Sequence, residues 1–485
     1  TNMNIAAHVK NNASIFGEKT AISYLNKQYT YKQVWSLIMG LSDILISKGI
    51  KKGDHIGLAM KDHPLHLIAH FSIAAIGAII VPIDHRWTEK EKERASLIFK
   101  VKLLIMDQGH ISNVNTISLT ESDIRENIHP NTEIDLNYNQ DLLISLSSGT
   151  TGKPKGAILT HNNLYQRFVS QQKTIGFNSE DSFGLLTPLF FGAGRSFAMC
   201  MLVIGGRAVI APPPHKPHEI VEILNNNDIN ATFLPPTLLR RLLPMALISK
   251  PLLGALEHLI YSGEPLHSEE ALACFEKLSP KLTGYYASSE GGGISVIKPL
   301  EIENYSETVG RAIYQTDIKI VDDENHEVDL GVVGKLKYKG PGVATNFLDD
   351  KGNKFSTERD DGWFFPGDLA KKLPSGHIQL IGRSNDLIIR GGINIYPNEI
   401  ESILINDPGI REVAVIGHKN SEFGEAIIAF IDSNSEFELK KCLDFCKNNL
   451  APYKIPTKFI QLDYLPKKES GKIDKQRLKK SLEKL

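Results

Sequence analysis

A run of small, hydroxylated and basic residues from Leu146 to Lys155 is well suited to binding an anion. Its serines, threonines and glycines leave room for a ligand, and their hydroxyls and backbone N–H groups can converge on one phosphate. Lys153 and Lys155 add positive charge. The run is not a Walker loop, because neither Gly149 nor Gly152 is followed by Gly-Lys at the required spacing. The same composition is also typical of an ordinary surface loop, so both interpretations stay open at this point.

The residues on either side of this run predict the secondary structure that flanks it. Residues 141–146 are apolar enough for a buried strand, and residues 160–163 (Thr-His-Asn-Asn) predict the start of a helix. We therefore expect the run to link a strand to a helix. Three later apolar runs, at 231–234, 256–261 and 281–286, each end in small or polar residues. Ligands of open α/β sheets bind beyond the carboxyl ends of the strands, so these ends predict a site of that kind.

The order of the expected elements predicts an α/β fold. Strands alternate with helices up to about residue 300, which indicates mostly parallel sheets covered by helices. From Ile318 onward shorter alternating strands predict a small β-rich subdomain. Beyond Arg383 a self-contained α+β pattern follows. We expect a large N-terminal domain, residues 1–384, and a small C-terminal domain, residues 385–485, with the boundary near Asn385-Asp386.

Composition excludes several classes of protein. The 485 residues suggest about three compact units. With 55 Lys and Arg against 56 Asp and Glu, the net charge of −1 gives no attraction to nucleic acid or acidic membranes. Four scattered cysteines predict a reduced, cytoplasmic protein. Polar residues interrupt the longest apolar run, residues 65–83, so we expect a buried helix and strand there and no membrane segment.

Five motifs together resemble those of the adenylate-forming superfamily, which includes acyl-CoA synthetases, adenylation domains of peptide synthetases and luciferases. The first is the phosphate-loop signature at 147–156. The others follow in the superfamily's order: Tyr-Ala-Ser-Ser-Glu at 286–290, Gly-Trp-Phe-Phe-Pro-Gly-Asp at 362–368, a hinge motif at 382–399, and Pro466-Lys467 with Gly471-Lys472. One such motif is weak evidence, but five in order cover nearly the whole chain.

The resemblance implies a two-step reaction. ATP would convert a fatty or aryl carboxylic acid into an acyl-adenylate, and the acyl group would then pass to the thiol of coenzyme A. The attacking carboxylate is already ionised near neutral pH, so this step needs no general base. Positioning and charge neutralisation would supply most of the catalysis, with Mg²⁺ on the phosphates. The C-terminal domain would be mobile, rotating about the hinge between the steps.

The resemblance also assigns roles to residues. Lys472 would reach the substrate carboxylate and α-phosphate, Glu290 would bind Mg²⁺, and Lys155 would hold the β- and γ-phosphates. The candidate cofactor-binding residues are Ser147, Ser148, Gly149, Thr150, Thr151, Gly152, Lys153, Gly263, Glu264, Pro265, Tyr285, Tyr286, Ser289, Asp368, Arg383, Gly391 and Gly392. Among these, Asp368 would accept hydrogen bonds from both ribose hydroxyls. Without the motifs, Lys472 would be one lysine of a basic tail, and Asp368 a turn residue.

The acid pocket is expected around residues 187–192. Relatives in the superfamily carry His or Asp where this chain has Phe191, and a buried α-ammonium group without a carboxylate would be costly. We therefore expect no amino acid substrate, and an apolar pocket formed by Phe190, Phe191, Phe233 and Gly291. Arg195 could pair a second carboxylate on the substrate, although an exposed helix arginine is the commoner case.

Two alternatives remain for the function. A separate acyl- or peptidyl-carrier protein could replace coenzyme A as the acceptor; coenzyme A is preferred because the chain shows no carrier segment after Lys472. A nucleotide-binding protein without turnover is the second alternative, and the presence of Glu290 and Lys472 argues against it. Asn385 also departs from the superfamily's hinge residues, Asp or Lys.

Overall fold

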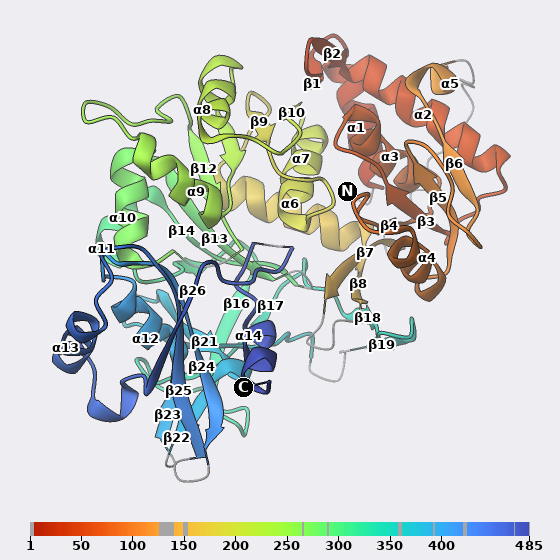
Figure 1. Cartoon of the computed structure of the whole chain (residues 1–485). Helices are drawn as coiled ribbons and strands as arrows, with labels where there is room; N and C mark the ends of the chain where they lie inside the picture. Colours follow the sequence, from red (N-terminus) through yellow and green to blue (C-terminus); the bar gives the residue numbers. More distant parts are fainter. Residues whose placement is uncertain are drawn as a thin grey trace.

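The computed structural model describes residues 4–125, 140–148, 154–263, 266–288, 291–356, 361–390, 393–420, 424–469 and 471–484. Within these residues the strands form two large sheets, a four-stranded sheet, a hairpin and a three-stranded sheet. Figure 1 shows the C-terminal part, in blue, lying against the green and cyan part of the chain, with the N-terminal elements in red and orange beyond.

The first large sheet has the strand order β19-β18-β8-β7-β4-β3-β5-β6. Its parallel strands are β3 (His55–Ala59), β4 (Ile79–Pro82), β5 (Val101–Met106), β6 (Thr116–Ser118) and β7 (Asp141–Ser148). Antiparallel strands β8 (Pro154–Thr160), β18 (Asn346–Leu348) and β19 (Lys354–Ser356) extend one edge. The helices of this part are α2 (Tyr31–Ser47), α3 (Pro64–Ala75), α4 (Glu89–Ile98) and α5 (Glu121–Arg125). Every residue of α3 is buried, which explains the long apolar run in the sequence.

The second large sheet has the order β15-β14-β13-β12-β11-β9-β10-β1-β2. Its strands are β1 (Thr20–Tyr24), β2 (Lys27–Thr30), β9 (Ser182–Leu185), β10 (Arg207–Ile210), β11 (Ala231–Phe233), β12 (His258–Tyr261), β13 (Leu282–Ser288), β14 (Gly292–Ile297) and β15 (Arg311–Ala312). In this order, all neighbouring pairs between β13 and β1 are parallel. Strands β2, β14 and β15 pair antiparallel with their neighbours. The helices here are α1 (Ile5–Ile15), α6 (His161–Ile175), α7 (Gly192–Ile204), α8 (Pro217–Asn226), α9 (Pro236–Leu242), α10 (Ser268–Lys277) and α11 (Ile302–Tyr305).

The segment around the glycine-rich run differs from the sequence expectation in one respect. The run is flanked by β7 and β8, which pair antiparallel with Ser147 opposite Lys155. Helix α6 then begins at its N-cap Thr160, whose side chain accepts from the Asn163 N–H at 3.0 Å. The predicted helix start is confirmed, but the prediction that the run leads directly into that helix is wrong. Residues 157–159 are buried and pair with β7, which makes them a strand.

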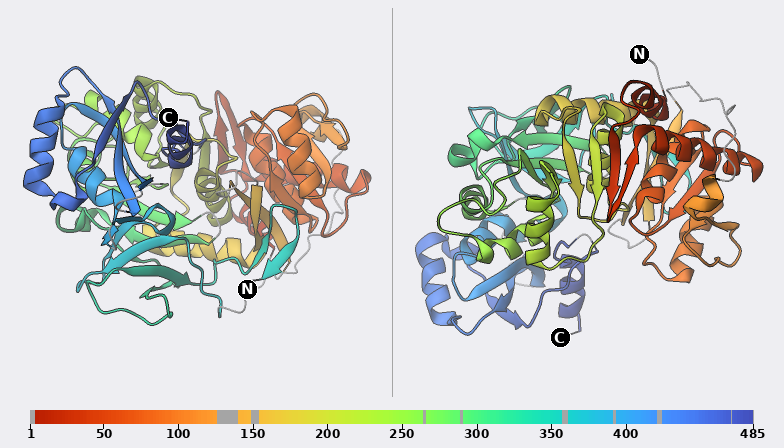
Figure 2. Two further views of the ribbon diagram at one scale, coloured as in Figure 1. Left: turned by 60° about the horizontal axis from the view of Figure 1, so that its bottom comes forward. Right: turned by 90° about the horizontal axis from the view of Figure 1, so that it is seen from above.

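The C-terminal half has the predicted change of architecture. An antiparallel sheet consists of β16 (Asp317–Val321), β17 (Gly334–Lys339), β20 (Asp368–Lys372) and β21 (Ile378–Arg383). The α+β unit that follows contains β22 (Ile388–Arg390), β23 (Ile393–Ile395), α12 (Pro397–Leu404), β24 (Ile410–Asn420), β25 (Gly424–Ser433), α13 (Leu439–Asn449), β26 (Lys458–Leu462) and α14 (Lys475–Leu482). It has its own apolar core, including Ile400, Ile427 and Cys446. The predicted fold class, α/β with a separate small C-terminal domain, is confirmed, and Figure 2 shows the small domain from two further sides.

Four cysteines, Cys200, Cys274, Cys442 and Cys446, are buried free thiols. In the part of the chain that the structure describes, every helix is too short or too polar to cross a membrane.

Candidate functional site

A large cleft of about 2830 Å³ runs between the two large sheets and the C-terminal unit. Its walls include the carboxyl ends of the parallel strands, among them Phe233 at the end of β11 and Tyr261 at the end of β12. Asp368 and Arg383 line it from the four-stranded sheet, and Lys472 lines it from the C-terminal unit. The cleft therefore brings together residues from Phe233 to Lys472 at the sheet ends where the sequence predicts a site.

One side of the cleft holds a carboxylate between two protein donors. Asp368 begins β20 and pairs with Arg383 at the end of β21, whose Nη1 donates to Asp368 Oδ1 at 3.0 Å. The Tyr286 hydroxyl, from β13, donates to the other oxygen, Oδ2. Burial raises the pKa of Tyr286 well above its usual value and the Asp368 charge raises it further, so the phenol keeps the proton that it donates. This arrangement fixes the Asp368 carboxylate, with further lone pairs available to a ligand.

Lys472 lies on a tight hairpin of the C-terminal unit. Lys467 and Ile473 form a β-bridge, and the Lys468 N–H donates to the Lys472 carbonyl at 2.8 Å. Gly471 closes this turn with φ +87°, a left-handed conformation that glycine adopts without strain. Lys467 is paired with Glu412. The hairpin backbone thus positions the exposed Lys472 side chain at the cleft.

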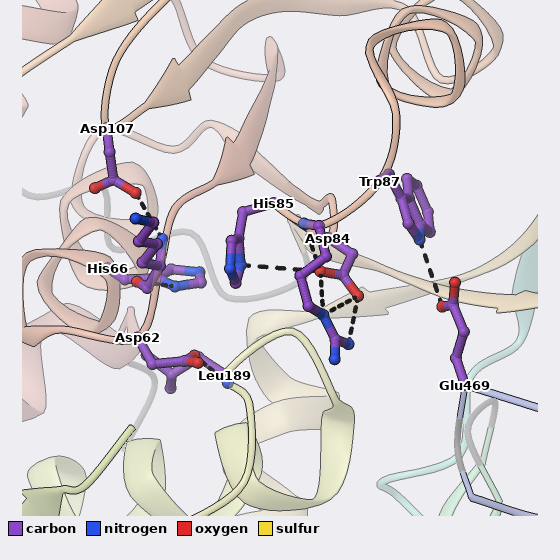
Figure 3. Close-up of polar contacts among 10 residues, drawn as sticks. Asp62, His66, Asp84, His85, Trp87, Asp107, Leu189 and Glu469 are labelled. Atoms are coloured by element: carbon purple, nitrogen blue, oxygen red, sulfur yellow. Dashed lines mark hydrogen bonds and ion pairs between the residues drawn. The ribbon is translucent and has the colours of Figure 1, made fainter. Parts of the chain in front are cut away.

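The segment between β4 and α4 joins the hairpin to the expected acid pocket. Trp87 Nε1 donates to Glu469 Oε2 on the hairpin at 3.4 Å, and the two side chains face each other in Figure 3. The Trp87 ring also meets the Phe190 ring edge-on, with centroids 5.4 Å apart. Sequence reasoning missed Trp87 and Glu469, since they belong to none of the motifs; the only signal was a tryptophan among polar residues.

An ion pair holds the same segment in place. Arg86 Nη2 donates to Asp84 Oδ2 at 2.7 Å, and the Arg86 guanidinium lies 5.7 Å from the centre of the Phe191 ring. Burial alone would raise the pKa of Asp84, but the hydrogen bonds and charge of Arg86 outweigh it and leave that pKa below its usual value. Figure 3 shows Asp84 beside His85. Asp84 therefore stays ionised and orients Arg86 over the pocket wall.

The aromatic residues expected in the acid pocket, Phe190, Phe191 and Phe233, line the cleft together with Tyr285. Gly291 is not among the described residues that line it: the Tyr338 hydroxyl oxygen lies 1.6 Å from where a Cβ of Gly291 would be. Gly292 and Gly293 do line the cleft, but a Cβ at Gly293 would be 2.1 Å from the Tyr285 hydroxyl oxygen. Gly291 and Gly293 therefore make space for the two tyrosines instead of leaving a void for an acyl group.

The structure describes some of the expected site residues fully, some by their backbone alone, and others not at all. Gly263 lines the cleft with φ +104°, and a Cβ there would meet open space. Ser147, Ser148 and Lys155 are placed by their backbone in β7 and β8. The residues that lie outside the described ranges are Gly149, Thr150, Thr151, Gly152, Lys153, Glu264, Pro265, Ser289, Glu290, Gly391 and Gly392. Within those ranges, no group of three His, Cys, Asp or Glu side chains could hold a metal ion.

Solved structures share this architecture. An o-succinylbenzoate CoA synthetase from Bacillus subtilis, in complex with the acyl-adenylate intermediate, has a TM-score of 0.88 and 24% identity, covering 98% of both chains. An ATP-bound MatB from Rhodopseudomonas palustris has a TM-score of 0.88 and 23% identity, covering 99% of both. The fold is therefore that of enzymes solved with adenine nucleotides.

Sequence comparison identifies the family. The model of the AMP-binding enzyme family matches residues 9–348, and that of the AMP-binding enzyme C-terminal domain matches residues 399–472. The chain belongs to the AMP-binding enzyme family. It is 28% identical to a 2-succinylbenzoate–CoA ligase from Listeria innocua, over 95% of this chain and 96% of the relative. It is 25% identical to an indoleacetate–CoA ligase from Aromatoleum aromaticum, over 98% of this chain and 97% of the relative.

Proposed function

We propose that this protein is an AMP-forming acid–thiol ligase, which uses ATP to convert a carboxylic acid into an acyl-adenylate and then into its coenzyme A thioester. The observation that carries the proposal is the meeting of Asp368, Arg383 and Lys472 in one cleft between the two parts of the chain. The family match and the named CoA ligases among the relatives support the same reaction.

Each described group has a task in the first step. The nucleotide fits the cleft because the Asp368 carboxylate, fixed by Tyr286 and Arg383, can accept from the two ribose hydroxyls. Gly263 also lines the cleft, with open space where its Cβ would be, so its backbone can approach a flat base. Lys472 places an ammonium group where charge develops as the acid oxygen attacks the α-phosphorus. A bound Mg²⁺ supplies further charge neutralisation, and Glu290 would be its protein ligand, since Mg²⁺ needs only one or two carboxylates besides phosphate oxygens.

The acid that we propose is aromatic. Phe190, Phe191 and Phe233 give the cleft an apolar wall that suits a planar ring. Two of the named relatives are ligases of aryl acids, 2-succinylbenzoate and indoleacetate. We further propose a domain boundary at residues 384/385 and a cytoplasmic location, which the buried free cysteines support.

Pyrophosphate release tests the proposal. Purified protein would be incubated with ATP, Mg²⁺ and a panel of aryl and fatty acids, with and without coenzyme A. We expect acid-dependent release without coenzyme A, and a thioester of the expected mass when coenzyme A is added. Release that stays at the no-acid background with every acid would reject the ligase and favour a nucleotide-binding protein. An adenylate that forms but is transferred only to a carrier protein would identify the other acceptor.

The Trp87–Glu469 contact predicts an effect on one step only. Trp87→Phe keeps an aromatic ring but removes the N–H, so the Lys472 hairpin loses its hydrogen bond to the opposite wall. One such bond contributes about 1 kcal/mol, so adenylation should slow by roughly 5-fold. Thioester formation from synthetic acyl-adenylate and coenzyme A should be unchanged. Trp35→Phe, in α2, is the matched control; an equal loss in both steps would contradict the positioning role.

A further inference from the structure

The aromatic wall of the acid pocket lies on a turn that leads from β9 into α7. The Phe191 N–H closes this turn by donating to the Pro188 carbonyl at 3.1 Å. Phe191 is also the N-cap of α7, and its side chain makes no capping hydrogen bond. The first N–H groups of a helix have no partner within it, so they add little local support. The position of the Phe190 and Phe191 rings therefore depends on contacts from other elements.

A carboxylate from the first large sheet holds this turn by its backbone. Asp62 follows β3, and its Oδ1 accepts a hydrogen bond from the Leu189 N–H at 2.8 Å, across 127 positions of the sequence. Figure 3 shows the two residues beside each other. Asp62 is only 8% exposed and Leu189 is fully buried, so water has little access to this bond. The carboxyl end of a strand in one sheet thus fixes a turn that belongs to the other sheet.

A guanidinium holds the same turn by its carbonyl groups. Arg195 lies near the start of α7 and is only 4% exposed, so the expectation of an exposed helix arginine is wrong. Its Nη1 donates to the Phe190 carbonyl at 2.7 Å and to the Leu189 carbonyl at 3.5 Å. The backbone of Leu189 is therefore held at its N–H by Asp62 and at its carbonyl by Arg195.

The buried charge of Asp62 favours a role in the pocket. Burial raises the pKa of this carboxyl above its usual value. The Leu189 N–H and the charges of His85 and Arg86 oppose that rise. A buried carboxylate is costly, and groups with such shifts are concentrated at functional sites. Because Asp62 also lines the cleft, this combination favours a role in the pocket over a role in folding alone.

We propose that Asp62 is a positioning residue of the acid pocket. By holding Leu189, it sets where the Phe190 and Phe191 rings stand, and with them the preference of the pocket for a flat aryl body. The inference rests on the proposed ligase function and adds to it a residue from the opposite sheet. Without Asp62, the Leu189 N–H is left buried and unpaired, so the turn shifts toward another partner. Even a small shift of the wall changes which acids are held in a reactive position.

Three variants and one control test this role. Asp62→Leu and Asp62→Ala both remove the acceptor, and the alanine adds no bulk that could unfold the protein. Asp62→Asn keeps an oxygen that can accept from Leu189. Asp54→Leu is the control, because Asp54 lies at the other end of β3 and accepts the Lys51 N–H at 2.6 Å. The measurements are kcat and KM for pyrophosphate release with phenylacetate and with hexanoate, the Kd of each acid by calorimetry with AMP present, and the melting temperature.

We expect the wild type to prefer phenylacetate to hexanoate by about 10-fold or more, in kcat/KM and in Kd. Asp62→Leu and Asp62→Ala should reduce this preference to below about 3-fold through a higher KM for phenylacetate, while the KM for ATP stays within about 3-fold of the wild type. Asp62→Asn should keep most of the preference, and Asp54→Leu should keep all of it. A wild type without this preference, or an equal loss with both acids in Asp62→Ala, would overturn the inference.

Amide hydrogen exchange separates this inference from the ligase proposal. The Leu189 N–H should exchange about 10-fold faster or more in Asp62→Ala than in the wild type, as followed by mass spectrometry of peptides that cover the turn. Asp62→Asn and Asp54→Leu should exchange like the wild type. Unchanged exchange in Asp62→Ala would overturn the positioning role, even in an active enzyme. If no acid releases pyrophosphate but exchange rises and phenylacetate binds more weakly in Asp62→Ala, the positioning role stands and the ligase proposal fails.

Discussion

Lys472→Ala should slow acyl-adenylate formation by about 10²–10³-fold, because a positioned charge in a cleft is lost just where negative charge develops. The Lys472 side chain is held by the hairpin backbone and lines the cleft, so its removal leaves the fold of the C-terminal unit in place. ATP affinity should stay within about 3-fold, since the residues assigned to the ribose lie on other elements. Single-turnover pyrophosphate release and equilibrium ATP binding are the two measurements.

Lys468→Ala is the matched control for that variant. Lys468 lies on the same hairpin with an exposed side chain, and only its backbone takes part in the turn. Its loss should leave adenylation nearly unchanged. If Lys472→Ala and Lys468→Ala behave alike, or if Lys472→Ala releases pyrophosphate at the normal rate, Lys472 is simply part of a solvated basic tail.

Asp368→Asn should weaken ATP binding by roughly 30-fold or more, since it removes one member of a partly buried, charged hydrogen-bonded pair. Asp368 is 9% exposed and accepts from Tyr286 and Arg383, so the variant also leaves the Arg383 charge without its carboxylate. Tyr286→Phe removes one hydrogen bond and keeps the ion pair, and it should cost only about 5-fold. Calorimetric titration with ATP measures both effects.

A comparison with Asp317→Asn controls for the loss of one negative charge. Asp317 is an exposed residue at the start of β16, in the same four-stranded sheet. ATP binding by this variant should match that of the wild type. An Asp368→Asn protein that binds ATP as tightly as the control would mean that Asp368 only stabilises the sheet and does not contact the ribose.

The C-terminal domain is where the sequence predicts the structure best. The α+β pattern that the sequence predicts beyond Arg383 is present as the unit from β22 to α14. The start of α6 at Thr160 is also predicted correctly. These features depend on local signals, namely the spacing of apolar residues, capping side chains and proline. Such signals are present in a few neighbouring residues.

Features that depend on distant residues could not be predicted. Trp87 and Glu469 meet although 382 positions separate them. Gly291 was expected to open a pocket, but Tyr338 from β17 occupies that space. The strand β8 was missed because residues 157–159 pair with β7, and their short apolar run fits a helix start equally well. In each case the partner that decides the outcome comes from another element.

The two donors on Asp368 have a consequence for the choice of nucleotide. Tyr286 and Arg383 each bind one of its oxygens, so the carboxylate is oriented before any ligand arrives. Each oxygen keeps a further lone pair, so a sugar that lacks its 2′-hydroxyl would leave one of these lone pairs without a donor in a partly buried place. We therefore expect the enzyme to turn over dATP far more slowly than ATP. As a result, this reaction would not consume cellular dATP.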